Sequence, residues 1–160
     1  MNIQPGQDNP KNKTIVFQNP PQDFCAKFEI VSCHIEKDDK LLFLKRAKNK
    51  LQPNTWGVPG GKKDNNETDQ EAIIREVFEE TNISIQKKYL SYFKKVYIRY
   101  PDYDFIYHIF IYKLPNQSVN ITLNPNEHNS CRWVSVKDAI SKKLPLILGE
   151  ETCLRLIYNQ

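Results

Sequence analysis

The order of structural signals along the chain predicts an α/β domain with helices on both sides of a β-sheet. Strand-like patterns fill the middle of the sequence, and helical patterns lie between them and toward the C-terminal end. In DFIYHIFIYKL, at 104–114, both alternating sets of side chains are apolar or aromatic, which indicates a central strand covered on both faces. His108 in this strand is expected to be a packed or hydrogen-bonded core residue. These observations together favour an α/β/α layered domain.

Length and composition fit a single domain. With 160 residues, the chain is long enough to bury its own core without disulfides or structural metals. Charged residues make up 26%, and the net charge of +4 is not concentrated in one tail. No nucleic-acid partner is therefore expected, although a local positive site for an anion stays open. No apolar run approaches the ~20 residues of a membrane span, so no membrane partner is expected either.

The N-terminal part of the chain differs in composition from the rest. Residues 1–23 are polar and lack the apolar core of a signal peptide. This predicts a disordered arm followed by one domain over residues 24–160. No CxxC pair occurs among the four cysteines, Cys25, Cys33, Cys131 and Cys153. We therefore expect reduced, mostly buried thiols and a cytoplasmic protein.

The strand signals follow one another along the chain. KFEIVSCHI at 27–35 is followed by KDDK, a hairpin turn that leads into LLFLKR at 41–46. A polar loop at 47–54 comes next, and then the short apolar stretch WGVPGG, which ends in a proline and two glycines. Further strands are expected at 89–99, 103–114, 119–123 and 131–136.

Helices are expected at 67–82, 137–143 and 149–157. The apolar residues of the first recur one turn apart and fall on one side of a helical wheel: Ile73, Ile74, Val77 and Phe78. Three glutamates fall on an arc nearly opposite, Glu76, Glu79 and Glu80. The helix is thus expected to pack on the sheet through its apolar stripe and to point the three carboxylates outward together.

Three carboxylates so close together repel one another, by about 0.2–0.5 kcal/mol for a pair one turn apart. The face is therefore either simply solvated or stabilised by a bound cation. Mg²⁺ prefers oxygen ligands and keeps several waters that substrate phosphates can displace. Gly60 and Gly61 precede the helix and let the backbone approach closely, so that the Gly60 carbonyl can join the carboxylates around a metal.

The spacing of these residues resembles a known signature. From Gly61 the chain reads GKKDNNETDQEAIIREVFEETNI: a glycine, five residues, Glu67, seven residues, Arg75-Glu76, and shortly afterwards Glu79-Glu80. This is similar to the box of the Nudix (MutT-type) hydrolases, and a chance match is expected on the order of 10⁻⁷ per starting position. Where the family has a glycine, this chain has Asn82, the next-best residue for a left-handed helix C-cap.

The resemblance extends beyond the box and covers most of residues 25–140. LLFLKRAKNKLQPNTWGVPGGKKDNNE, at 41–67, resembles the family's strand, loop and W-x-x-P-G-G lead-in. EHNSCRWVSVKDA, at 127–139, resembles its later segment, in which an acidic residue precedes a strand with tryptophan and then a helix. The resemblance implies a Nudix-like α/β/α sandwich with a mixed β-sheet.

The resemblance also implies roles for the box residues. Glu79 and Glu80 match metal ligands, and Glu76 matches a third ligand or an oriented catalytic base. The expected metal is Mg²⁺ or Mn²⁺. Arg75 matches the arginine that holds a box glutamate in place, and Glu67 matches the glutamate that braces the preceding loop against the helix.

Residues outside the box have implied roles as well. Arg46 and Lys62 match basic positions that contact phosphate, and Glu127 matches a position where several members place an additional catalytic or metal-binding carboxylate. Trp56 can stack on a substrate base or belong to the core, and both interpretations stay open. His128, beside Glu127, can either reach the site or lie in solvent as a loop histidine, and the second interpretation is favoured.

Members of the family hydrolyse a nucleoside diphosphate linked to another group, with metal ions neutralising the charge that develops. The short single-domain length and the VPGG lead-in favour a nucleoside-triphosphate pyrophosphohydrolase. Two alternatives stay open: a dinucleoside polyphosphate hydrolase, in which Tyr100 would have a counterpart, and a non-catalytic Nudix-like nucleotide sensor. The expected partner is a small-molecule nucleotide, and the expected assembly is a monomer or a homodimer.

Overall fold

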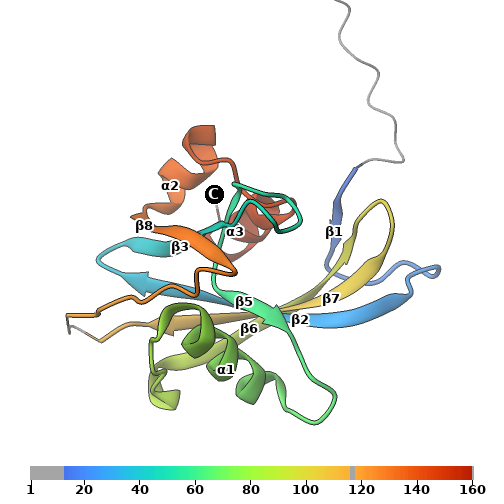
Figure 1. The fold of residues 1–160 in the computed structure, drawn as a ribbon. Coiled ribbons are helices and arrows are strands. Elements are labelled where there is room, and N and C mark those ends of the chain that lie inside the picture. Colours follow the sequence, from blue (N-terminus) through green and yellow to red (C-terminus); the bar gives the residue numbers. More distant parts are fainter. Residues whose placement is uncertain (1–12, 116–117, 160) are drawn as a thin grey trace, which may run out of the picture.

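A mixed β-sheet of eight strands forms the centre of the protein (Figure 1). The computed structural model describes residues 13–115 and 118–159. The strands are β1 (Ile15–Phe17), β2 (Ala26–Lys37), β3 (Lys40–Arg46), β4 (Trp56–Gly57), β5 (Gly60–Lys62), β6 (Leu90–Arg99), β7 (Asp104–Lys113) and β8 (His128–Val134). The helical segments are α1 (Asp69–Thr81), η2 (Lys87–Tyr89), α2 (Val136–Asp138), η3 (Ala139–Lys143) and α3 (Glu150–Tyr158). Within the described ranges, no helix is long and apolar enough to span a membrane.

Strand β2 determines where a site can form, because it changes its neighbour along its length. It pairs with β7 in parallel over most of its length. On its other edge it pairs with β3 near Glu36 and with β5 over Ile30–Ser32, both antiparallel. The strand order β1-β6-β7-β2-β3-β4 places β7 in the middle of the sheet, which confirms the predicted central strand.

Helices cover both faces of the sheet, as the sequence predicted. Figure 1 shows α1 on one side, and α2 and α3 on the other. The core beneath α1 includes Ile73 and Val77, whereas the opposite core contains Leu154 of α3. The α/β/α sandwich with a mixed sheet is thus confirmed.

Helix α1 has defined ends. Thr68 accepts a hydrogen bond from the Glu71 N–H, and the Glu71 carboxylate accepts one from the Thr68 N–H, which forms a capping box. At the other end Asn82 adopts the left-handed conformation, with φ 61°, and donates its N–H to the Phe78 carbonyl at 2.8 Å. The C-cap expected for Asn82 is therefore confirmed. Because the helix begins at Asp69, Glu67 lies in the loop before it.

Three local expectations differ from the structure. Residues 15–17 of the predicted disordered arm form β1, which pairs with β6 and places Val16 against the core; residues 1–12 lie outside the described part. The segment 119–123 forms no strand; its apolar residues pack against the core under α1, and Thr122 donates its N–H to the Thr81 carbonyl at 3.0 Å. The predicted helix at 137–143 is replaced by α2 and the wide turn η3, and the helical geometry is lost inside η3, where Lys142 takes a positive φ of 65°.

The four cysteines are free thiols. Cys33 and Cys153 are buried, Cys131 is partly buried and Cys25 is exposed. Burial raises the pKa of both the Cys33 and the Cys153 thiols, so neither is poised to act as a thiolate nucleophile.

Candidate active site

Helix α1 faces the sheet with only part of the side that its hydropathy predicted. Ile73 and Val77 are buried, but Phe78 is 50% exposed and Glu80 only 7% exposed. Two hydrogen bonds offset the cost of burying this carboxylate. Oε2 of Glu80 accepts the Gly60 N–H at 2.9 Å, and Oε1 lies 2.9 Å from Nε2 of His128. The expectation of three carboxylates opposite the apolar stripe is therefore wrong for Glu80, because a hydropathy wheel does not register polar partners on the sheet.

His128 is a buried residue of β8 that contacts Glu80. The favoured interpretation, a loop histidine in solvent, is therefore wrong, and the alternative that His128 reaches the site is the one that the structure supports. Strand β8 begins three residues earlier than the predicted strand at 131–136. Its first residue pairs with Arg46 across an irregularity in the β3–β8 ladder, and its side chain then reaches Glu80.

Glu76 lies against the backbone of β5. A Cβ atom added to Gly61 would collide with the Glu76 carboxylate, so the absence of a side chain at Gly61 lets this carboxylate take its position against the strand. Burial raises the pKa of Glu76 to about 6; the hydrogen bond from Arg75 opposes this rise, and the charges of Glu80 and Glu79 add to it. The three box carboxylates therefore influence one another electrostatically.

Arg75 connects the loop before α1 with the helix. Its Nε and Nη2 donate to the two carboxylate oxygens of Glu67 at 3.0 and 2.5 Å, and Nη2 also reaches the Lys62 carbonyl at 3.1 Å. Nη1 donates to Glu76 at 2.7 Å and lies 3.5 Å from Glu79. One guanidinium thus holds the loop and orients two of the box glutamates.

This arrangement leads to a stability prediction for Glu67→Gln. The neutral amide cannot make the paired, charge-assisted contact, so we expect the free energy of unfolding at pH 7 to fall by about 1–2 kcal/mol. The hydrogen bond from Arg75 lowers the pKa of Glu67 below its usual 4.5, so its contribution is complete above that pH and is lost as the pH falls through the lowered value. Denaturant unfolding at pH 7, 5 and 3 should show the difference between wild type and variant closing in acid. A pH-independent difference would contradict this assignment, and Glu151→Gln, at an exposed ion pair of α3, is the control.

The donor set of the box fits a hard divalent cation. Glu76, Glu79 and Glu80 supply carboxylate oxygens at the edge of one cavity, and Gly60 lies beside Glu80. A second group of side chains also places possible metal-ligand atoms close together. In the part of the chain that the structure describes, Glu29, Asp69 and His108 each offer one such atom, and these three atoms lie within 4.8 Å of one another. Among the box carboxylates, Glu76 is held by Arg75 and Glu80 by His128.

The Glu29–Asp69–His108 group is a hydrogen-bonded network of side chains. His108 Nε2 lies 2.6 Å from Glu29, and Nδ1 lies 3.2 Å from the Tyr92 hydroxyl and 3.3 Å from Asp69. Lys63 donates to Asp69 at 2.7 Å. The prediction that His108 is a packed or hydrogen-bonded core residue is confirmed.

Glu127 lies on the cavity wall and is paired with a lysine. Lys50 Nζ donates to its carboxylate at 2.6 Å, while the Glu127 carbonyl accepts the Ala47 N–H at 2.9 Å. Lys50 was not among the sequence-based candidates, because it lies 77 positions from Glu127 in a polar loop with no characteristic spacing.

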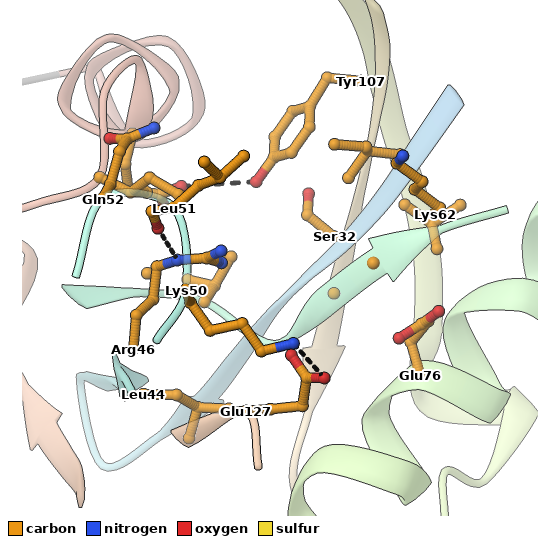
Figure 2. A pocket seen from close by; sticks show the side chains of 18 of the residues that line it. Ser32, Leu44, Arg46, Lys50, Leu51, Gln52, Lys62, Glu76, Tyr107 and Glu127 are labelled. Atoms are coloured by element: carbon orange, nitrogen blue, oxygen red, sulfur yellow. Dashed lines mark hydrogen bonds and ion pairs between the residues drawn. The ribbon is translucent and has the colours of Figure 1, made fainter. Parts of the chain in front are cut away.

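A cavity of about 640 Å³ joins these groups. Arg46, Lys50 and Lys62 line it, as do all three box glutamates and Glu127. Figure 2 shows Glu76 and the Lys50–Glu127 pair facing one region of the pocket, with Tyr107 lying farther away at its other end. The cavity thus has an acidic end with cations beside it and a second, aromatic end.

Both residues predicted to contact phosphate, Arg46 and Lys62, line this cavity, whereas Trp56 does not. Arg46 donates Nε to the Leu51 carbonyl at 2.7 Å, which leaves its Nη groups for a ligand, and the Lys62 ammonium lies 4.2 Å from the Phe28 ring centroid. Trp56 is only 4% exposed, belongs to the core on the α3 side and is absent from the cavity lining. Its proposed role in substrate binding is therefore corrected to a core role.

The aromatic end contains a buried pair that sequence reasoning missed. Glu150, the first residue of α3, is 2% exposed and lines the cavity. Its Oε1 lies 3.0 Å from Nε2 of the fully buried His34 in β2, and the Tyr107 hydroxyl lies 3.5 Å from Oε2. The two members are 116 positions apart, so no local pattern could have revealed the pair.

Comparisons with known proteins agree with this geometry. The NUDIX domain family matches residues 28–156. The CTP pyrophosphohydrolase of Escherichia coli (strain K12) is 29% identical over 118 residues, which is 72% of this chain and 82% of that protein. The MutT NUDIX hydrolase of Burkholderia pseudomallei has a TM-score of 0.69 at 22% identity, covering 80% of this chain and 95% of that one. The MutT protein of Methanosarcina mazei Go1 has a TM-score of 0.70 at 22% identity, covering 82% and 92%.

Proposed function

The chain belongs to the NUDIX family and is a hydrolase of pyrophosphate bonds, and we propose that it cleaves a nucleoside triphosphate to the monophosphate and pyrophosphate. One observation carries this proposal: a single cavity joins the box carboxylates and three cations to an aromatic end. A triphosphate fits the first part and a base the second. Similarity to a CTP pyrophosphohydrolase supports the same substrate class.

Three cations are proposed to hold the phosphates. Arg46, Lys50 and Lys62 line the cavity, and each can approach a phosphate oxygen without displacing a box carboxylate. Lys50 can exchange its contact with Glu127 for a phosphate, which frees the Glu127 carboxylate toward the reacting water. Cations that bind ground state and transition state alike contribute to KM more than to kcat.

The acidic end is proposed to hold a divalent cation and to move the proton of the attacking water. Glu76, Glu79, Glu80 and the Gly60 carbonyl would hold Mg²⁺ or Mn²⁺, which when bound neutralises the charge that develops on the phosphate oxygens. Arg75 orients Glu76, and Lys50 holds Glu127. These two carboxylates are the candidates to accept the proton as the water oxygen bonds to phosphorus and the anhydride bond breaks.

A product-release screen tests the substrate class. Nucleoside triphosphates, dinucleoside polyphosphates and ADP-ribose are each incubated with the enzyme and Mg²⁺, and products are separated by anion-exchange chromatography. We expect a triphosphate to have the highest kcat/KM, with monophosphate and pyrophosphate formed in equal amounts. Faster cleavage of a dinucleoside polyphosphate would move the assignment to that class. Binding without turnover of any substrate would indicate a nucleotide sensor.

A further inference from the structure

The inner end of the cavity holds a carboxylate that the hydrolytic chemistry does not use. Glu150 lines the same cavity as the box glutamates but sits on α3, on the opposite side of the sheet from α1. A buried carboxylate is costly unless hydrogen bonds satisfy its oxygens. His34 and Tyr107 both contact Glu150, the latter at 3.5 Å.

His34 fixes the orientation of this carboxylate. Its Nδ1 is buried without a hydrogen-bond partner, while Nε2 faces Oε1 of Glu150 at 3.0 Å. Because a carboxylate oxygen only accepts, Nε2 is the donor in this contact. A carboxylate offers about four acceptor sites, so Oε2 retains capacity for a donor that enters the cavity.

The walls around Glu150 suit a flat, uncharged ring. Tyr100, Tyr107, Ile98 and Ile147 line the cavity there. A phosphate would be repelled by Glu150 and attracted to the cations near the box. A nucleotide therefore enters with its base directed toward Glu150.

Resting on the proposed function, we infer that Glu150 selects nucleobases that present an amino group, and so distinguishes cytosine from uracil. The cytosine N4 amino group donates to a carboxylate, as Glu and Asp commonly accept from this group in base recognition. Uracil has a carbonyl oxygen at the same position, which would face the lone pairs of Glu150. A site that offers a fixed acceptor discriminates strongly against a ligand that lacks the donor.

Glu150→Gln gives a directional test. His34 keeps donating to the amide oxygen, so the amide NH₂ occupies the position of Oε2 and turns an acceptor into a donor. The wild-type kcat/KM is expected to be at least about tenfold higher for CTP than for UTP. In the variant this ratio should fall by about tenfold or more, through a loss for CTP and a gain for UTP. Glu151→Gln, at the next residue of α3 and outside the cavity lining, should leave the ratio unchanged.

Calorimetry can measure the affinity of the wild-type enzyme for the α,β-methylene analogues of CTP and UTP. This measurement tests base selection separately from hydrolysis, and it does not depend on whether a variant folds. Preference for the CTP analogue without turnover of either triphosphate would refute the hydrolytic proposal and support the base selection. Equal turnover and equal binding of the two would overturn the role of Glu150 and leave the hydrolytic proposal standing. A folded Glu150→Gln enzyme with an unchanged ratio would overturn it as well.

Discussion

Glu80→Gln is expected to lower kcat by at least about 100-fold while leaving the fold intact. Glu80 is the most deeply buried of the three box carboxylates, and we propose it as a metal ligand. The substitution removes a ligand charge and keeps the shape of the side chain, so the loss should appear in the chemical step rather than in folding. Steady-state kinetics with saturating Mg²⁺ measure it.

The hydrogen bonds of Glu80 explain why the variant should fold. A glutamine oxygen can still accept the Gly60 N–H, and its NH₂ can donate to Nε2 of His128, because the ring proton can move to the unpartnered Nδ1. The variant also loses the repulsion from Glu76. Its melting temperature without metal should therefore equal or exceed that of wild type. A variant that unfolds would mark Glu80 as a structural residue, and Glu151→Gln is the matched control.

The sequence predicts those parts of the site that are formed by residues close together in the chain. The spacing of Glu67, Arg75 and Glu76 corresponds to the contacts of one guanidinium within a single loop–helix unit. Asn82 carries the C-cap signal that ends the helix. Periodicity also placed the central strand β7, since a strand covered on both faces must be apolar in both alternating sets.

Contacts between distant segments could not be predicted in this way. Phe78 was placed in the core and Glu80 in solvent because hydropathy ranks side chains without their partners, and His128 comes from a strand on the other side of the cavity. The pairs Lys50–Glu127 and His34–Glu150 join residues with no sequence relationship.

Removal of divalent metal is expected to abolish activity, and Mg²⁺ or Mn²⁺ to restore it. The carboxylates of Glu76, Glu79 and Glu80 supply the physical reason, because the charges of Glu79 and Glu80 raise the pKa of Glu76 and so oppose its ionisation in the absence of a cation. Dialysis against EDTA followed by titration with each metal measures the effect, with NaCl at matched ionic strength to separate screening from binding. Full activity in excess chelator would refute the metal assignment.

The shift in melting temperature caused by Mg²⁺, compared between variants, tests where the cation binds without relying on catalytic activity. A ligand at 100 times its Kd stabilises the folded state by about 2.7 kcal/mol, which raises the melting temperature of a domain of this size by roughly 5–10 °C. We expect Mg²⁺ to produce this shift in wild type and a much smaller one in Glu80→Gln. Asp69→Asn removes a carboxylate from the other acidic group, Glu29–Asp69–His108, and should retain the full shift. If Asp69→Asn loses the shift while Glu80→Gln keeps it, the cation binds at that second group, and the box carboxylates do not hold it.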